Sequence, residues 1–352
     1  MRLNFTYDLS AHRILHDREV RSRLSGMRSA GVETIFVFGY FYGHYESPEE
    51  EIARARRVLE DEGFRTGVIN LPCGHGGNAL DPNDETLRLE ISDRWQMRAD
   101  ETGRRYPTAA CIEEKMIADS RSANEVFRQM GYRRLICDDD LRLGPWGKGL
   151  RGCFCERCMA EFSALAGRRV DRSELMNVEN DALRSQWMDY QCAKVTRFLT
   201  ETTPLDMQGG IMVMHNGDRR HGVDIPAIRA AMPEDFMLRV GEGHFDDAAF
   251  LDPRAQASLE ASILNHLTLF GDDERCYSES TVFPANALSP ENWIRKMELE
   301  IRCGLRNLFL MSGTWFFTDP YWKLLARSLP RLAELAQTRP LPHGLRVPIW
   351  QM

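Results

Sequence analysis

Short apolar runs alternate with amphipathic segments along most of the chain. The runs are rich in β-branched and aromatic residues, and several lack the apolar–polar alternation of a half-exposed strand. Continuous apolar runs of this length are typical of parallel strands covered on both faces. The predicted strands are residues 3–7, 33–39, 65–71, 133–138, 209–214, 236–241, 275–280 and 307–313.

The segments between these strands carry helix signals. The sequence SPEE at 47–50 combines a capping serine, a first-turn proline and acidic residues, and Ile52, Ala55 and Leu59 then fall on one face. The sequence SPEN at 289–292 starts a second helix in the same way. The chain therefore reads as strands that alternate with helices.

Eight strands alternating with helices predict an α/β fold, a (β/α)8 TIM barrel. A doubly wound open sheet has the same periodicity, but the chain lacks a glycine-rich phosphate loop, which favours the barrel. The connections after the third and fourth strands are long. We expect residues 1–340 to form the barrel, with an insertion at about 72–132 and 141–205, and 341–352 to form a tail.

Composition narrows the class of partner. The 352 residues are 43% hydrophobic and 28% charged, with a net charge of -7, which argues against nucleic acid or an anionic membrane as the main partner. No apolar run approaches the roughly 20 residues that span a bilayer, and the N-terminus lacks the apolar core of a signal peptide. We expect a cytoplasmic protein, and the sequence leaves a homo-oligomer open.

Three cysteines form a C-x-C-x-x-C pattern after the fourth strand: Cys153, Cys155 and Cys158. Thiolates at this spacing suit tetrahedral zinc, and Cys111, in the other long connection, is the preferred fourth ligand over Cys73. Four sulfurs leave no open coordination position, which predicts a structural Zn²⁺ that joins the two connections. The alternatives are ordinary buried thiols or a catalytic zinc.

Carboxylates end two of the predicted strands. Asp138, Asp139 and Asp140 end the fourth strand, where side chains alternate between the barrel interior and the helix layer, so that not all three can face one pocket. Glu279 ends the seventh. Acids on these two strands would face each other across a barrel mouth, and glycoside cleavage with retention needs two carboxyls about 5–5.5 Å apart.

Polar and aromatic residues follow nearly every predicted strand, which is typical of a pocket that binds sugars. Arg142 is also close enough in sequence to pair with an acid of the aspartate run. The candidate substrate-binding residues are Tyr40, His75, Arg142, His215, Asn216, Glu242, His244 and Trp315.

The motifs resemble a known group of enzymes. The C-x-C-x-x-C pattern with a cysteine some forty residues upstream is similar to the zinc site of glycoside hydrolase family 42 β-galactosidases, which belong to a clan of retaining (β/α)8 glycosidases. The chain also resembles uncharacterised glycosidase-like barrels with segments of the type D-D-D-F-R, G-C-F-C and S-E-x-x-x-F-P. These appear here at 138–142, with Leu141 in place of Phe, and at 152–155 and 278–284. The resemblance implies a carbohydrate substrate, Glu279 as nucleophile, and Asp140, or its neighbour Asp139, as acid/base.

Three readings of the function stay open. The first is a retaining hydrolase of a β-linked sugar, with a variant in which an aspartate of the fourth strand is the nucleophile and Glu242 the acid. The second is a carbohydrate-binding barrel without turnover, because the clan has Glu where this chain has Asp140. The third is a hydrolase with a catalytic zinc on the cysteines.

Overall fold

A closed barrel of eight parallel strands forms the body of the molecule in a computed structural model, which describes residues 2–73, 90–138, 141–144, 149–311 and 316–338. All eight predicted strands are present, so the predicted (β/α)8 fold is confirmed. The barrel strands are β1 (Asn4–Leu9), β2 (Val32–Phe41), β4 (Arg65–Leu71), β7 (Arg134–Cys137), β8 (Gln208–Met212), β9 (Met237–Arg239), β10 (Cys276–Tyr277) continued by β11 (Ser280–Thr281), and β12 (Asn307–Met311).

The strand order shows the closure directly. Neighbours follow the path β1-β12-β10-β9-β8-β7-β4-β2, and β1 also pairs with β2 in parallel, which joins the two ends of the sheet. The short strand β3 (His44–Tyr45) pairs antiparallel with the end of β2. Because every barrel strand runs the same way, all their carboxyl ends meet at one face of the barrel, here called the barrel mouth.

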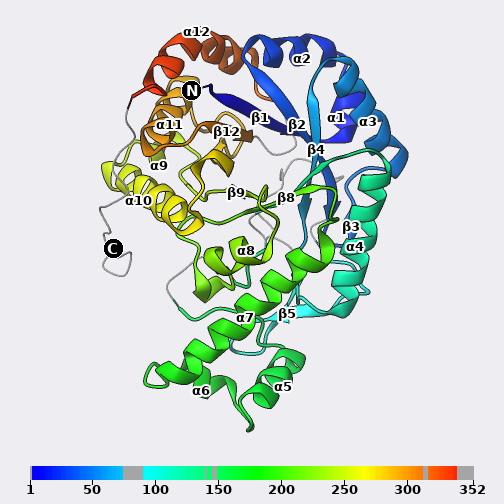
Figure 1. The fold of residues 1–352 in the computed structure, drawn as a ribbon, viewed down its shortest axis with the longest axis vertical. Coiled ribbons are helices and arrows are strands. Elements are labelled where there is room, and N and C mark those ends of the chain that lie inside the picture. The colour runs from blue at the N-terminus through cyan, green and yellow to red at the C-terminus, as the bar shows by residue number, and fades with distance from the viewer. Residues whose placement is uncertain (1, 74–89, 139–140, 145–148, 312–315, 339–352) are drawn as a thin grey trace.

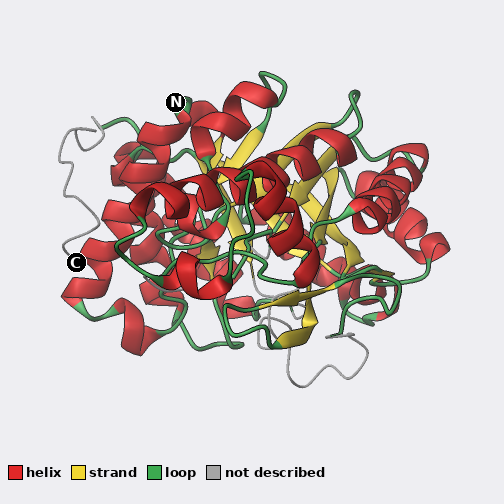
Figure 2. Ribbon diagram, turned by 90° about the horizontal axis from the view of Figure 1, so that it is seen from below, coloured by secondary structure: helices red, strands yellow, loops and turns green. Residues whose placement is uncertain are grey.

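Helices surround the barrel (Figure 2). They are α1 (Ala11–His16), α2 (Val20–Ser29), α3 (Glu49–Asp61), α4 (Glu114–Gln129), α5 (Glu156–Leu165), α6 (Arg172–Met176), α7 (Asp181–Thr202), α8 (Ile225–Ala231), α9 (Asp247–Phe250), α10 (Pro253–Phe270), α11 (Pro290–Cys303) and α12 (Asp319–Leu335), with short 3-10 turns at Arg219–His221 and Asp273–Arg275. Helices α3 and α11 begin in the segments SPEE and SPEN. Ser289 caps α11 as predicted, and its side chain accepts from the Asn292 N–H. The prediction of Ser47 as the cap of α3 is wrong, because the N-cap there is Pro48.

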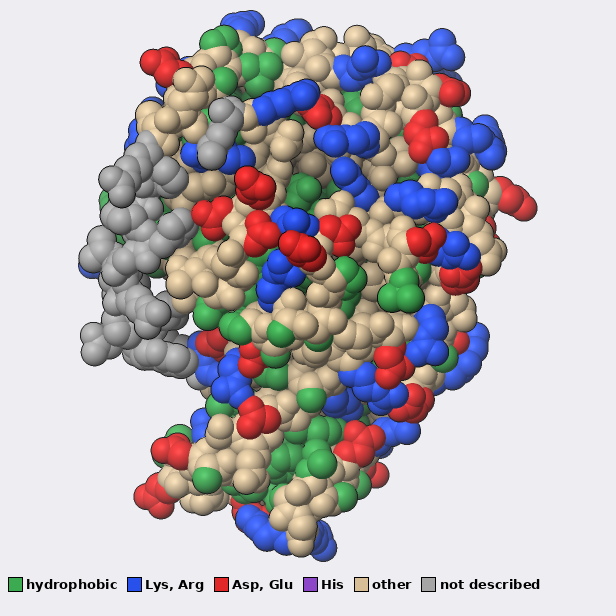
Figure 3. Space-filling model, in the orientation of Figure 1, with side chains coloured by type: hydrophobic (Ala, Val, Ile, Leu, Met, Phe, Trp, Pro, Cys, Tyr) green, Lys and Arg blue, Asp and Glu red, His purple; other side chains and the backbone are tan. Residues whose placement is uncertain are grey.

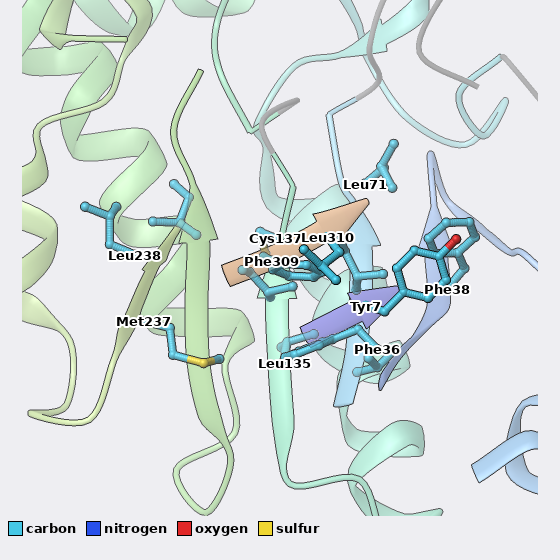
Figure 4. Close-up of a cluster of buried hydrophobic side chains, with 14 of the residues drawn as sticks. Tyr7, Phe36, Phe38, Leu71, Leu135, Cys137, Met237, Leu238, Phe309 and Leu310 are labelled. Carbon is cyan, nitrogen blue, oxygen red and sulfur yellow. The ribbon is translucent and has the colours of Figure 1, made fainter. Parts of the chain in front are cut away.

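Large apolar side chains on both faces of the barrel strands are buried in one cluster (Figure 4). The rings of Phe36 on β2 and Phe309 on β12 lie 5.4 Å apart, centroid to centroid. Tyr7 is on the neighbouring strand β1 but packs outward, its ring 5.3 Å from Phe317 and 5.2 Å from Trp322. The barrel is thus a packed core, and polar groups that reach its mouth are held against that core.

A second, smaller core lies outside the barrel and is called here the cysteine subdomain. It is built from the antiparallel hairpin β5 (Met97–Ala99) and β6 (Arg105–Ala110), the segment before α5, the helices α5 and α6, and the first half of α7. α5 and α6 project away from the barrel, and apolar side chains gather on this part of the surface (Figures 1 and 3). The hairpin was not predicted from the sequence.

Helix α7 belongs to both cores. Trp187, in its first half, is fully buried in the cysteine subdomain, stacked 4.8 Å from Phe154. Val195, Phe198 and Leu199, further along, belong to the barrel core. The helix therefore ties the two bodies together. Among the described residues, no helix has the length and apolarity that crossing a bilayer requires.

Candidate functional site

Glu279 sits at a break in the seventh barrel strand. β10 ends at Tyr277 and its continuation β11 begins at Ser280, so that Ser278 and Glu279 interrupt the ladder at the barrel mouth. The Glu279 side chain is 4% exposed, and its Oε2 accepts hydrogen bonds from the backbone N–H groups of Glu242, at 2.6 Å, and Gly243, at 3.1 Å. Two aimed N–H donors stabilise negative charge on this oxygen.

Residues on one face of α11 form hydrogen bonds to the segment that interrupts this strand. Trp293 Nε1 donates to the Ser280 carbonyl at 2.9 Å, and Lys296 Nζ donates to the Glu279 carbonyl at 2.7 Å and the Gly243 carbonyl at 3.0 Å. Glu300 Oε2 accepts from Ser280 Oγ at 2.6 Å. The spacing of these three α11 residues places them on one helix face. The backbone that carries Glu279 is therefore fixed on both sides.

Arg239 joins the fourth strand to the seventh inside the barrel. This fully buried guanidinium donates from Nη1 to Asp138 Oδ1 at 3.1 Å and from Nη2 to Thr281 Oγ1 at 2.9 Å, and it lies 4.6 Å from the centre of the Phe309 ring. Its Nε also points at the Ser278 carbonyl, at 3.4 Å. The acid that ends β7 and the segment that carries Glu279 thus share one buried cation.

Two buried acids face the barrel interior. Asp138, 4% exposed, is the member of the aspartate run that reaches Arg239. Asp8 on β1 is fully buried and pairs in register with Phe36, whose ring lies in the interior, so Asp8 shares that side of the sheet. Asp139, Asp140, His75 and Trp315, predicted as site residues, lie outside the described residues.

Glu242 does not lie where the sequence analysis expected. Its side chain is 0% exposed, and its Oε2 is 3.5 Å from Lys296 Nζ in the layer between β9 and α11. Burial, and then the nearby charge of Glu300, raise the pKa of Glu242 well above its ordinary value. Its backbone N–H supports Glu279, and its side chain is part of the scaffold beneath the site.

His215, Asn216 and His244 come together after β8 and β9. Asn216 Nδ2 is 2.8 Å from His215 Nε2, and the His215 and His244 rings lie edge to face at 5.2 Å. Burial, and then the neighbouring His244, lower the pKa of His215 to about 3, so this imidazole is neutral at pH 7. The three residues form a partly exposed polar group in the segments after β8 and β9, and β9 neighbours the strand that leads to Glu279.

Backbone strain marks the same end of the barrel. Tyr42, Asn216 and His244 have φ angles of 56°, 52° and 59°, in the left-handed region that non-glycine residues rarely adopt. They follow β2, β8 and β9 respectively. Such strain persists only where the surrounding structure enforces it, and it is concentrated at functional sites.

Tyr40 and Arg142 have other surroundings. The Tyr40 ring packs edge to face on Tyr45 at 5.2 Å and Trp95 at 6.2 Å, and burial is the main cause that raises its pKa to about 12. The Arg142 carbonyl accepts a hydrogen bond from Arg98 Nη1 at 3.3 Å. Tyr40 is therefore a packed ring of the β2 end, in an aromatic group separate from His215 and His244.

The four cysteines predicted as metal ligands come together. Cys111, Cys153, Cys155 and Cys158 are buried in the cysteine subdomain, and their Sγ atoms all lie within 4.8 Å of one another. Cys111 Sγ is 3.4 Å from that of Cys158 and 3.8 Å from that of Cys155. All four are free thiols. Cys73, the alternative fourth ligand, belongs to the barrel core.

This sulfur cage fits a tetrahedral ion. Zinc–sulfur bonds of about 2.3 Å at tetrahedral angles place sulfurs about 3.8 Å apart, close to the separations found here. Lys194 Nζ donates to Cys158 Sγ at 3.1 Å, which supplies positive charge beside a group of thiolates. Hydrogen bonding with Cys111 is the first cause that lowers the pKa of Cys155 and of Cys158.

Two functional side chains escaped the sequence analysis. Arg239 lies in the apolar run FMLRVG, where an isolated charge in a strand signals a buried ion pair. Lys296 lies on an amphipathic helix, and nothing in its spacing separates it from exposed lysines. The first could have been found from the sequence, whereas the second required the packing of α11 against β10 and β11.

The chain has no match among protein-family models or curated proteins. Similar solved structures include a cycloalternan-forming enzyme from Listeria monocytogenes (9% identity, TM-score 0.48, covering 95% of this chain and 31% of that one). A putative alpha-galactosidase from Bacteroides fragilis has 13% identity and a TM-score of 0.45, and the match covers 96% of this chain and 60% of that one. A sialic acid synthetase from Leptospira borgpetersenii has 5% identity and a TM-score of 0.45, and the match covers 97% of this chain and 87% of that one. The chain thus spans less than two thirds of the first two. Similarity at this level does not bear on what this chain binds or catalyses.

Proposed function

We propose that this protein is a glycoside hydrolase that cleaves a β-linked sugar with retention of configuration. The observation that carries the proposal is the seating of Glu279: a carboxylate at the barrel mouth, with one oxygen held by two backbone N–H groups. A nucleophilic carboxylate needs a fixed orientation and a stabilised negative charge, and this arrangement supplies both.

In the proposed reaction, Glu279 attacks the anomeric carbon and an acid of the fourth strand donates a proton to the departing oxygen. We assign that acid to Asp140, with Asp139 as the alternative. A water molecule, deprotonated by the same aspartate, then attacks the glycosyl ester and releases the sugar and the free Glu279 carboxylate. Asp138 is not assigned this role, because its ion pair with buried Arg239 favours the charged form.

The variant that uses Glu242 as acid is not favoured. A raised pKa suits a proton donor, but the side chain is 0% exposed and lies against Lys296. A catalytic zinc is not favoured either, because the four sulfurs complete a tetrahedron and belong to a core separate from the barrel. For the cysteine cage we propose a structural zinc ion.

The experiment is hydrolysis of a panel of 4-nitrophenyl β- and α-glycosides. We expect turnover of at least one β-glycoside, and a loss of about 10⁴-fold or more in kcat for Glu279→Gln. Glu274→Gln is the matched control, because Glu274 is an exposed acid just before the same strand. Full activity in Glu279→Gln would rule out the assignment.

A carbohydrate-binding barrel without turnover is the second candidate. The observation that favours it is the burial of Glu279, which at 4% exposure offers little surface to a sugar. Saturable binding of a glycoside, with no hydrolysis by the wild-type protein and the same affinity in Glu279→Gln, would support this candidate over the enzyme.

A further inference from the structure

A second group of potential metal ligands lies on the outer surface, and it offers nitrogen and oxygen atoms instead of the sulfurs of the cysteine cage. His12 and His16 are on α1, and Glu51 is in the first turn of α3. One ligand atom from each residue can be chosen so that the three lie within 4.8 Å of one another. α1 and α3 lie side by side (Figure 1), so these residues come from two packed elements.

The two histidines share one face of α1. They are four residues apart, so their side chains lie one above the other on the helix, and their ring centroids are 4.6 Å apart. Ala11 and Ile14 bury the opposite face in the barrel core, which holds the helix in place. The helix is also capped, since Ser10 Oγ accepts from the Arg13 N–H at 3.2 Å. The imidazoles therefore project from a fixed platform.

Glu51 completes the group from the neighbouring helix. Its Oε1 lies 3.1 Å from His16 Nε2, and the two side chains are 24% and 46% exposed. α3 is anchored by Ile52, Ala55 and Leu59, which are fully buried. A cation would therefore find a carboxylate and an imidazole already facing each other, at a surface open to solvent.

The donor set selects the class of ion. Two imidazoles and one carboxylate suit zinc, nickel, cobalt or copper, whereas calcium and magnesium take oxygen ligands. Three protein ligands leave at least one position for water or another small ligand, unlike the closed set of four sulfurs. We propose that His12, His16 and Glu51 form an open binding site for a divalent transition metal.

The position of this site in the fold follows from the elements that carry its three residues. α1 directly follows β1, whose last residue is Leu9, and Glu51 is in the first turn of the helix that follows β2 and β3. The site is therefore at the same end of the barrel as Glu279 but on its outer rim. The proposal does not depend on the proposed glycosidase function, because it concerns binding alone.

The test is calorimetric titration of the full chain with Ni²⁺, after its cysteine-bound metal has been loaded. We expect one equivalent of Ni²⁺ to bind. His12→Ala and His16→Ala should each weaken binding at least about tenfold, and Glu51→Gln should weaken it less. Glu50→Gln is the matched control, because it removes an exposed carboxylate from the same helical turn and should leave the affinity unchanged.

Three outcomes would overturn the proposal: no saturable Ni²⁺ binding by the wild-type chain, unchanged affinity in both histidine variants, or equal loss in Glu50→Gln and Glu51→Gln. Thermal unfolding gives an independent readout. Ni²⁺ should raise the melting temperature of the wild type and of Glu50→Gln by the same amount, and should raise that of His12→Ala less, because an ion that bridges α1 and α3 binds only the folded chain.

Discussion

The barrel mouth and the cysteine subdomain both hold reactive side chains in fixed positions, but by different means. At the mouth, a closed parallel ladder and a large apolar core surround buried charges such as Arg239 and Lys296. In the subdomain the buried core is small: it consists of Ala99, Cys111, Leu150, Cys153, Phe154, Cys155, Cys158, Met159, Phe162, Val170, Leu175 and Trp187. Four of these core residues are the cysteines themselves.

The difference predicts which region would depend on the proposed zinc ion for its stability. A core as small as that of the subdomain gives little stability without a cross-link or a metal. The barrel buries far more apolar surface, which offsets the desolvation of its buried charges. Backbone contacts also tie the subdomain strands to its loops, since Phe154 N–H donates to the Ala99 carbonyl at 2.9 Å. We therefore expect metal loss to affect the subdomain first and the barrel mouth last.

Metal removal should give the largest effect. With a chelator, or in Cys158→Ser, amide hydrogens of β5, β6, α5 and α6 should lose nearly all protection, because structural zinc contributes roughly 10 kcal/mol or more to folding of small sites. Hydrogen exchange followed by mass spectrometry measures this, and barrel strands β1, β2 and β12 should keep their protection. Cys192→Ser, on α7 but outside the cage, is the control. Equal loss in both bodies would contradict the comparison.

Removal of the buried cation at the mouth should come next. Arg239→Met removes the ion pair with the buried Asp138 carboxylate, which should lower the free energy of unfolding by about 3–5 kcal/mol. Arg121→Met is the control, because Arg121 is 54% exposed and its pair with Glu201 should contribute about 1 kcal/mol or less. Urea unfolding gives both values.

A double variant sharpens the test of Arg239. Adding Asp138→Asn to Arg239→Met also removes the negative charge of the ion pair, so the double variant should be more stable than the sum of the two single losses predicts. Additive losses would mean that the two side chains do not interact. They would contradict the ion pair through which Arg239 links the fourth strand to the seventh.

Between pH 7 and pH 6 the pH dependence of stability should be the smallest of these effects. Burial lowers the pKa of His215 to about 3 and that of His266 to about 4, against 6.5 unperturbed. Below pH 6.5 these two histidines therefore bind protons in the unfolded chain but stay neutral in the folded chain. The free energy of unfolding consequently falls as the pH drops toward 4, by up to about 1.4 kcal/mol per pH unit for each histidine. Above about pH 7.5 no such loss is expected, since both states are neutral.

Unfolding free energies at several pH values would measure this slope. His266→Gln should flatten it between pH 4 and 6.5, relative to the wild type, and should track the wild type above pH 7.5. A slope that is the same in both proteins would mean that His266 does not contribute to the acid sensitivity of the barrel.

Sequence reasoning predicted the large features because they rest on local patterns. Apolar runs located every barrel strand, and the spacing of Cys153, Cys155 and Cys158 located three residues that do meet in space. The joining of Cys111 to them was also expected, since both long connections leave the same face of the barrel.

The finer features depend on register, which a sequence does not fix. Side chains alternate along a strand, so an uncertainty of one residue in the end of β7 decides which aspartate meets Arg239. Beyond the strand end the alternation stops. Glu242, three residues after β9, consequently turns toward Lys296 and the helix layer instead of the mouth.

The most direct test of the central claim is covalent trapping with 2-deoxy-2-fluoro aryl β-glycosides, read by peptide mass spectrometry. If Glu279 is the nucleophile, the fluorosugar should be found as an ester on the peptide that carries Glu279, and Glu279→Gln should not be labelled. Glu274→Gln should be labelled like the wild type. A stable label on Asp138 or on another carboxylate, with Glu279 unmodified, would contradict the account.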